Sequence, residues 1–297
     1  MSSPLALPMY AINPADNHAL WLTVKTQLAA QGLDVGHLQP ETPGDLLSHW
    51  RSPDLVLSQS CGFPLMTLLN EVQVVGAFHY TAPGCEGVSY RSWLVTREED
   101  EGNTLADFRG RRVVCNAADS WSGYNVLLSM VAELGVKGHF FATTLFSGSH
   151  RQSLVVLRDG LADIAAIDCV TWALLQRHEP WRLNGLKIIA GSPLAPGLPL
   201  ITAAGTSPAT LAALRTALHQ VAHSEQAEKS LINGFSALSR EAWQVLMARH
   251  AAAAGRGGTR LSEEEIEGGE GHHPDDHRGE QTAGDDPGHR RDNGRHQ

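Results

Sequence analysis

Apolar runs alternate with amphipathic runs in two successive series, and this alternation constrains the fold of the chain more than any other feature. Short apolar runs predict buried strands, and longer runs with apolar residues at helical spacing predict helices. A chain that alternates strand and helix builds a mostly parallel sheet covered by helices. The predicted strands span residues 5–12, 35–38, 54–58 and 72–78 in the first series, and residues 112–116, 140–144, 163–167 and 186–190 in the second.

Two strand-like connectors link the series and predict an α/β fold of two lobes joined by a two-strand hinge. Residues 90–96 lead into the second series, and the apolar run 198–203 returns the chain to the first sheet. The second series is then an insertion in the first. A single doubly wound sheet is the alternative. Helices are predicted at residues 208–223, 226–233 and 240–250, and the expected domains are a first lobe of residues 1–92 and 198–254, a second lobe of residues 93–197 and a disordered tail of residues 255–297.

The predicted tail differs sharply in composition from the rest of the chain. Large apolar residues almost vanish after Ile266, and residues 255–297 contribute −5 to the net charge of −9. Such sequence buries too little apolar surface to fold. Its histidines, His272, His273 and His277, are interpreted as solvated side chains rather than a metal site. The remaining residues form no basic stripe, which argues against a nucleic-acid partner.

The N-terminus predicts no secretory signal peptide. The first basic residue is Lys25, and Pro8 interrupts the short apolar run at residues 5–12. A signal peptide has a basic start followed by a continuous apolar stretch. A chain that begins at Met1 is therefore expected to stay in the cytoplasm, and it contains no apolar run long enough to span a bilayer.

The four cysteines do not form a C-x-x-C pair, so the sequence predicts no zinc site. Cys115 and Cys169 lie in apolar runs and are expected to be small buried thiols. Cys61 and Cys85 lie in loops that contain Gly and Pro. These two either pair in an oxidising compartment or remain free, and free thiols are the preferred interpretation.

Two turns of the second series carry the residue types that bind anions. Ser120, Ser122 and Gly123 join a buried strand to a long helix, and the serine-rich turn at residues 147–149 places His150 at the start of another helix. The first turn of a helix has unpaired N–H groups and a partial positive charge, which attract phosphate-like anions. Both turns follow strands, at the sheet edge where ligands of open α/β sheets bind. Simple helix capping is the alternative for each turn.

Polar residues also end several of the other predicted strands. Asp168 ends a strand of the second series, where it either meets a ligand cation or caps the next helix. The corresponding residues of the first lobe are Tyr10, Ser58, Ser60 and Tyr90. Ser122, His150 and Asp168 do not suggest a hydrolase, because the serine lacks the G-x-S-x-G elbow. No phosphate-binding P-loop or dinucleotide loop is present in the two lobes.

Four motifs in order resemble one known family. They are LADFRGRRVV at residues 105–114, DSWSGY at residues 119–124, SGSH at residues 147–150 and ADIAAID at residues 162–168. This set resembles the phosphate, phosphite and phosphonate substrate-binding proteins of ABC transporters. The resemblance covers about residues 5–249 and implies the type II periplasmic binding fold. One departure is the absence of tyrosine from residues 38–47.

The resemblance implies roles for individual residues. Ser120, Ser122 and Gly123 would hold the phosphorus oxyanion, Tyr90 would add its hydroxyl from the other lobe, and Asp168 would meet a ligand ammonium. The full set of candidate ligand-binding residues is Ser120, Trp121, Ser122, Gly123, Tyr90, His150, Asp168, Tyr10 and Ser60.

The expected function is therefore capture of a small phosphorus oxyanion for an ABC permease, without chemistry and without a cofactor or metal. The protein is expected to act as a monomer, in the periplasm by family role. Two alternatives are a cytosolic anion sensor and an enzyme on the same fold, similar to the pyrimidine-precursor synthases.

Overall fold

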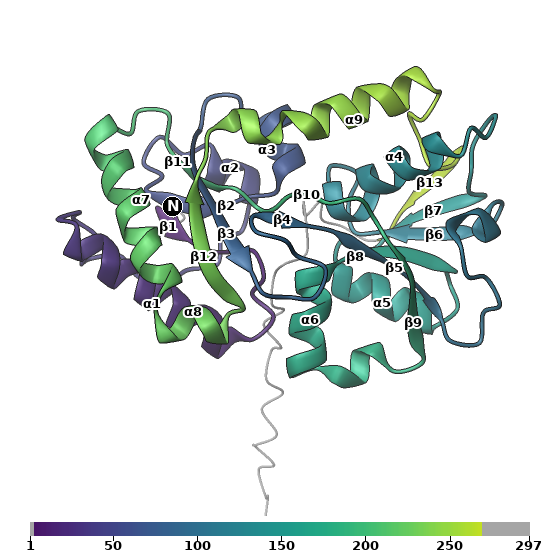
Figure 1. Ribbon diagram of the computed structural model, residues 1–297, viewed down its shortest axis with the longest axis horizontal. Coiled ribbons are helices and arrows are strands. Elements are labelled where there is room, and N and C mark those ends of the chain that lie inside the picture. The colour runs from purple at the N-terminus through teal and green to yellow at the C-terminus, as the bar shows by residue number, and fades with distance from the viewer. Residues whose placement is uncertain (1–2, 269–297) are drawn as a thin grey trace, which may run out of the picture.

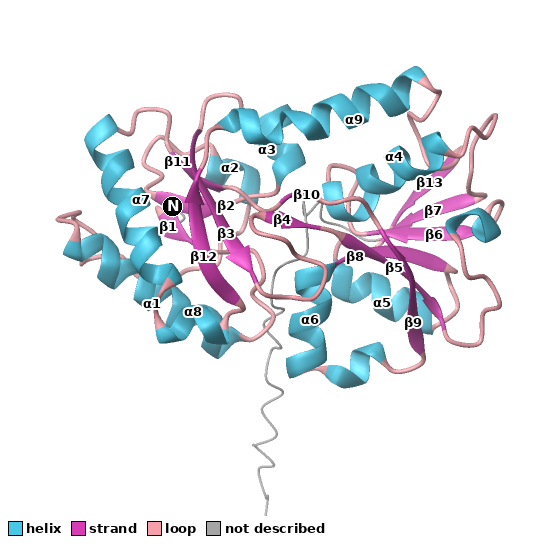
Figure 2. Cartoon of the chain, in the orientation of Figure 1, coloured by secondary structure: helices cyan, strands magenta, loops and turns pink. Residues whose placement is uncertain are grey.

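The computed structural model describes residues 3–268 and contains two α/β lobes that lie side by side (Figure 1). The first lobe is built on a five-stranded sheet and the second on a six-stranded sheet. Helices cover both faces of each sheet (Figure 2). The first sheet has the order β1 (Leu5–Ala6), β2 (Leu57–Gln59), β11 (Leu200–Thr202), β3 (Gln73–Tyr80) and β12 (Ile232–Ala237). The second has the order β13 (Glu264–Glu267), β7 (Thr143–Phe146), β6 (Arg112–Cys115), β8 (Ile164–Asp168), β5 (Ser92–Arg97) and β9 (Leu186–Gly191).

The strand directions follow from the connections. Helices link β6, β7 and β8, which are parallel, whereas the crossing strand β5 pairs antiparallel with β8. The returning strand β11 is antiparallel to both β2 and β3. The two crossing segments also pair with each other, as β4 (Ser89–Tyr90) and β10 (Ala195–Pro196). This arrangement confirms the predicted α/β fold with a two-strand hinge.

Local signals explain most of the helix boundaries. Helix α1 (Pro14–Ala30) begins with proline after the cap residue Asn13, whose side chain accepts from the Asp16 N–H at 3.0 Å. Its buried Leu20, Val24 and Leu28 repeat at helical spacing. The other helices are α2 (Leu46–Trp50), α3 (Gly62–Leu68), α4 (Val126–Glu133), α5 (His150–Arg158), α6 (Cys169–His178), α7 (Pro208–Ala222), α8 (Glu225–Lys229) and α9 (Gln244–Gly255). None of the described helices is long and apolar enough to cross a membrane.

Two local predictions are wrong. Residues 35–38 form a turn rather than a strand, because the Leu38 N–H bonds the Val35 carbonyl at 3.0 Å and both side chains point into the core. The helix predicted at residues 226–233 ends early in α8, and the chain then enters β12. Leu231, with φ of 61°, makes the break between them.

The end of the first lobe also differs from the prediction. Helix α9 leaves the first lobe and packs on both α3 and α4, so it spans the two lobes (Figure 1). Strand β13 then pairs parallel with β7 at the edge of the second sheet. Leu261 and Ser262 are fully buried. The prediction of a disordered tail is therefore wrong for residues 255–268, and the rest of that tail, with His272, His273 and His277, lies outside the described residues.

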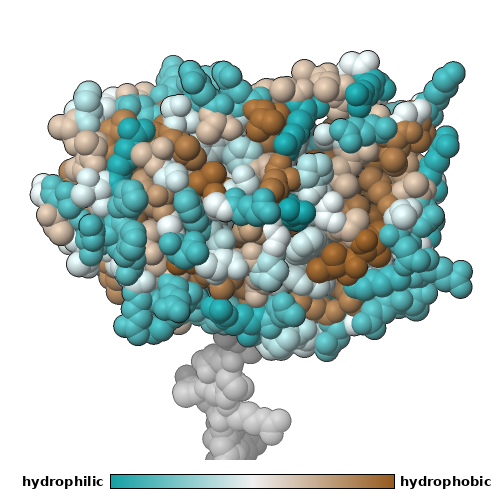
Figure 3. Space-filling model, viewed as in Figure 1, coloured by the Kyte–Doolittle hydropathy of each residue, from teal (hydrophilic) through white to brown (hydrophobic). Residues whose placement is uncertain are grey.

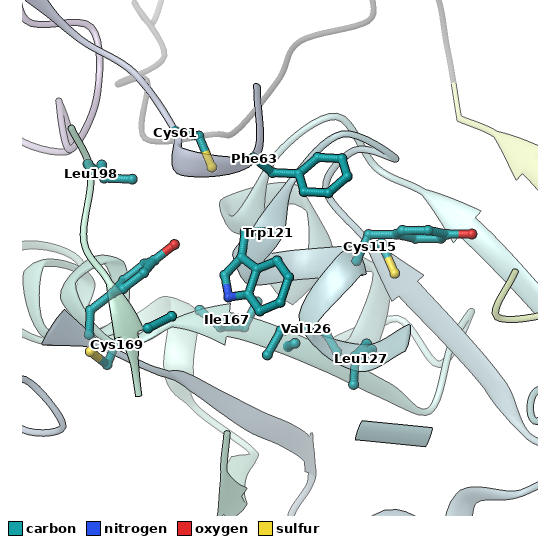
Figure 4. Close-up of a cluster of buried hydrophobic side chains, with 14 of the residues drawn as sticks. Cys61, Phe63, Cys115, Trp121, Val126, Leu127, Ile167, Cys169 and Leu198 are labelled. Carbon is teal, nitrogen blue, oxygen red and sulfur yellow. The ribbon is translucent and has the colours of Figure 1, made fainter. Parts of the chain in front are cut away.

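The apolar core extends from one lobe into the other. Trp121 of the second lobe is 2% exposed and belongs to the same buried cluster as Cys61, Phe63 and Leu198. Figure 4 shows its indole ring among these side chains. Burial of an indole removes roughly 150–250 Å² from water. The cluster therefore holds the lobes together, while the outer face in Figure 3 mixes hydrophilic and hydrophobic residues.

Candidate anion-binding site

Two loops and one strand end of the second lobe meet at one edge of its sheet. The loops follow the parallel strands β6 and β7 and lead to Ser120 and Ser149, and Asp168 is the last residue of β8, directly before α6. Parallel strands carry their C-terminal ends to the same edge, where ligands of open α/β sheets bind. The topology therefore gathers candidate residues that are far apart in the sequence.

The first of these loops ends in a wide helical turn. Trp121–Asn125 form one turn of π-helix, closed by the Asn125 N–H bonding the Ser120 carbonyl at 3.0 Å. The Ser120 hydroxyl caps this turn by accepting from the Gly123 N–H at 3.1 Å. A Cβ at position 123 would overlap Asn116 Oδ1 and lie 2.8 Å from its Cγ. Any side chain at position 123 would therefore force the Asn116 amide or the turn to move, and single π-helical turns are frequent at functional sites.

Ser122 connects this turn to the start of helix α5. Its hydroxyl lies 2.9 Å from His150 Nε2 and 3.4 Å from the Ser120 hydroxyl. Its carbonyl accepts from the Ser92 hydroxyl at 2.7 Å, which fixes the turn against the crossing strand β5. Ser122 and His150 are fully buried. The structure thus brings two helix starts into direct contact at a polar, enclosed point.

The serines of the second turn serve the local backbone. Ser149 caps α5 by accepting from the Gln152 N–H at 2.9 Å. Ser147 lies 2.7 Å from the Ser153 hydroxyl. These contacts fit the capping interpretation for residues 147–149, whereas His150 projects toward Ser122.

Asp168 makes one hydrogen bond within the second lobe and one to the first lobe. Its Oδ1 accepts from the Val170 N–H at 2.7 Å and caps α6, and its Oδ2 accepts from the Tyr10 hydroxyl at 2.6 Å. Burial and the neighbouring carboxylate raise the pKa of Tyr10 well above its usual range. Tyr10 has a left-handed backbone with φ of 57°, which is uncommon without glycine. The Tyr10–Asp168 hydrogen bond thus connects the two lobes.

Tyrosines gather on the first-lobe side of Asp168. Tyr80 lies edge-on to Tyr10 with ring centroids 5.1 Å apart, and its hydroxyl accepts from Gln59 Nε2 at 3.1 Å. Tyr90 is buried nearby, and burial raises the pKa of Tyr80. The sequence interpretation missed Gln59 and Tyr80. The available signal was their position at the ends of strands β2 and β3.

The remaining candidates lie in different settings. The Ser60 hydroxyl donates to the Cys61 carbonyl at 3.3 Å, and Ser58 lies 2.8 Å from His49 Nε2. Trp121 contributes an apolar wall rather than a polar contact to the cluster described above. Within residues 3–268, no group of His, Cys, Asp or Glu side chains is arranged to hold a metal ion.

A cavity between the lobes adjoins the tyrosines. Its lining includes Tyr10, Gln59 and Tyr80 from the first lobe and Leu174 and His178 from the second. Polar contacts cross the lobes around it. The Arg151 side chain, paired with Glu179 at 2.8 Å, also reaches the Ile12 carbonyl at 3.4 Å. The lobes are therefore closed on each other around Asp168.

Comparison with known proteins agrees with this architecture. The sequence model of the family described as ABC transporter, phosphonate, periplasmic substrate-binding protein matches residues 53–243, more than half of the chain. A search of curated proteins gave no match. The chain belongs to this family of periplasmic substrate-binding proteins of phosphonate ABC transporters, which confirms the resemblance seen in the motifs. Its role is solute binding, with a small ligand and an ABC permease as the partners that the family implies.

Solved structures share the fold at low sequence identity. The binding-protein component of an ABC phosphonate transporter from Pseudomonas aeruginosa has 17% identity and a TM-score of 0.68, over 85% of this chain and 86% of that one. PhnD1 from Prochlorococcus marinus, in complex with methylphosphonate, has 14% identity and a TM-score of 0.65, over 84% and 98%. A Xanthomonas citri protein bound to ATP has 18% identity and a TM-score of 0.62, over 86% and 98%. At such identities these likenesses establish the fold.

Proposed function

We propose that the chain captures a small phosphorus oxyanion, of the phosphate, phosphite or phosphonate class, between its lobes and delivers it unchanged to an ABC permease. It does so in the periplasm and as a single copy. The observation that carries the proposal is the contact of Ser122 with His150 at 2.9 Å, which joins two helix starts at the edge where β6, β7 and β8 end. The family role of solute binding supports it.

In the proposed site, Ser120, Ser122, Gly123 and His150 hold the oxyanion. The hydroxyls and the imidazole are hydrogen-bond donors, the Gly123 N–H holds the Ser120 hydroxyl in place, and helix starts favour negative charge. Each hydrogen bond to a charged group contributes about 1.5–3 kcal/mol. Three such bonds offset an association cost of about 4–15 kcal/mol only when the site is preorganised. The capped π-turn and the Ser92 contact supply that preorganisation.

Asp168, Tyr10 and Tyr90 are proposed to face the substituent on phosphorus. A buried carboxylate needs a partner, and Tyr10 is its partner across the lobes. A ligand ammonium would compete for the same oxygen. The buried indole of Trp121 fills the space beside the serines and favours a small substituent.

The contacts of Asp168 favour binding over catalysis. A serine hydrolase needs its carboxylate to orient the histidine. Here, one carboxylate oxygen caps α6 and the other accepts from Tyr10. The carboxylate is therefore held by the helix start and by the opposite lobe. We propose that the chain is not an enzyme, and incubation with each anion followed by phosphorus NMR should return the anion unchanged.

Titration calorimetry tests the binding site. The protein is titrated with phosphate, phosphite, methylphosphonate, aminoethylphosphonate and sulfate. Ser122→Ala should weaken the tightest of these at least tenfold, about 1.4 kcal/mol, because it removes a buried donor to a charged group.

The matched control for this test is Ser262→Ala. Ser262 is also fully buried in the second lobe, but its hydroxyl bonds Thr144 and the Glu264 carbonyl. It should leave the affinity unchanged. Equal affinity in Ser122→Ala and the wild-type chain would refute the site, and the absence of binding to every phosphorus oxyanion would refute the ligand class. Sedimentation and cell fractionation test the single copy and the compartment.

A further inference from the structure

Two cysteines far apart in the sequence lie against each other beside the site. The sulfur atoms of Cys85 and Cys169 are 3.5 Å apart. A disulfide bond is about 2.05 Å long, so the sulfurs must approach by only about 1.5 Å. All four cysteines of the chain are free thiols in the structure. This pair differs from Cys61–Cys85, which the loop contexts suggested.

The backbone holds the two cysteines together. The Cys169 N–H donates to the Arg91 carbonyl at 3.0 Å, and the Arg91 side chain donates through Nε to the Gly84 carbonyl at 3.0 Å. Gly84 has φ of 99°, and a Cβ there would lie 3.2 Å from Cys169 Cβ and 2.8 Å from the Trp93 ring. The loop before Arg91 therefore rests directly on Cys169, and glycine permits this approach.

We propose that Cys85 and Cys169 form a disulfide bond in the oxidising periplasm, where this family acts. Structural disulfides persist in that compartment. Cys85 lies in the loop between β3 and β4, and this loop starts at Thr81, whose N–H bonds the Leu231 carbonyl of the first lobe at 2.8 Å. Cys169 opens α6 of the second lobe, next to Asp168. The bond would tie the first crossing segment to the helix that carries the ligand-facing carboxylate.

The chemistry requires a disulfide-containing oxidant, such as oxidised glutathione. The hydrogen bond with Cys85 and the burial of Cys169 raise the pKa of the Cys169 thiol. Cys85 is partly exposed and therefore reacts first. The Cys85 thiolate attacks one glutathione sulfur, breaks that S–S bond and releases one glutathione thiolate. The Cys169 thiolate then attacks the Cys85 sulfur and releases the second. Two thiols are oxidised, one glutathione disulfide is reduced, and the two protons pass to the released thiolates.

Peptide mapping tests this proposal on the full chain. The reduced protein is exposed to oxidised glutathione, denatured, alkylated and digested. One cross-linked peptide pair containing Cys85 and Cys169 is expected, with Cys61 and Cys115 alkylated. The oxidised protein should melt roughly 5–10 °C above the reduced one.

Variants separate this bond from other effects. Cys85→Ser should abolish both the cross-link and the rise in melting temperature, because it removes one sulfur of the pair. Cys85 lies in a partly exposed loop, so this variant is expected to fold. Cys61→Ser is the control, since it removes a thiol outside the pair, and it should retain both. Four alkylated cysteines in folded, oxidant-treated protein would overturn the proposal, as would a Cys85 that stops at the glutathione adduct or pairs with Cys61. None of these outcomes depends on the anion site.

Discussion

The two lobes approach the proposed ligand with different chemistry. The second lobe presents hydroxyls and an imidazole at helix starts, held by hydrogen bonds such as Ser92 to the Ser122 carbonyl. The first lobe presents tyrosines, and its Tyr10 reaches Asp168 directly. Fixed donors suit a charged oxyanion, whereas aromatic hydroxyls suit the variable substituent. The proposed site therefore predicts that donors of the second lobe provide affinity, and that the Tyr10–Asp168 contact between the lobes provides closure and selectivity.

Gly123→Ala is expected to have the largest effect, by weakening the binding of the oxyanion to the second lobe. The added methyl group would overlap Asn116 Oδ1 and push apart the turn that carries Ser120 and Ser122. Losing several charged hydrogen bonds of about 1.5–3 kcal/mol each should weaken oxyanion binding on the order of 1,000-fold by calorimetry. Gly205→Ala, in open space, should bind as the wild-type chain does. Wild-type affinity in Gly123→Ala would show that the turn does not bind the anion.

Acid is expected to destabilise the first lobe more than the second. Burial lowers the pKa of His49 in the first lobe from 6.5 to about 4. Between these values the unfolded chain binds a proton that the folded chain does not, so stability is full above pH 6.5 and falls as the pH drops toward 4. The loss is about 3 kcal/mol at most.

Urea unfolding at pH 7 and pH 4.5, with hydrogen exchange read for each lobe, measures this effect. His49→Gln should remove most of the loss, since it keeps a polar neighbour for Ser58 without the titrating ring. In the second lobe, the Asp163 carboxyl among Arg97, Arg111 and Arg112 has a lowered pKa and should keep its contribution through this pH window. Equal acid sensitivity of His49→Gln and the wild-type chain would contradict the assignment to His49.

Asp168→Asn is expected to change the selectivity between ligands with and without an ammonium group. Asparagine retains the capacity to cap α6 but removes the charge that would meet a ligand ammonium. Binding of aminoethylphosphonate should weaken about 10- to 100-fold, because charge-assisted hydrogen bonds are roughly twice as strong as neutral ones. Methylphosphonate should lose less than about threefold. An equal loss for both ligands in calorimetry would show that Asp168 does not read the substituent.

Tyr10→Phe is expected to have the smallest effect. It removes the hydroxyl that donates to Asp168 but keeps the ring against Tyr80. Loss of one hydrogen bond across the lobes should weaken ligands without an ammonium group about threefold to tenfold. Thr202→Val is the control, since the buried Thr202 hydroxyl bonds Thr206 and the Leu55 carbonyl within the first lobe and should not alter binding. A larger effect in the control would place closure elsewhere.

Local sequence patterns predicted the two-lobed fold, and the ordered motifs indicated the family. Both are properties of neighbouring residues, because strand and helix periodicity and glycine turns extend over short stretches of the chain. These patterns failed where distant contacts decide. Residues 226–233 look helical, yet the edge of β3 recruits Ile232–Ala237 as a strand. Residues 264–267 are acidic and predict a disordered tail, yet they pair with β7 at the edge of the second sheet.

The sequence by itself determined which residues end the strands and start the helices, and therefore which side chains were candidates for the site. Only the tertiary structure decided which of them meet: Ser122 with His150, Tyr10 with Asp168, and Cys85 with Cys169. The physical reason is range. Capping and periodicity act over a few residues, whereas these three contacts depend on how sheets, crossing segments and lobes pack.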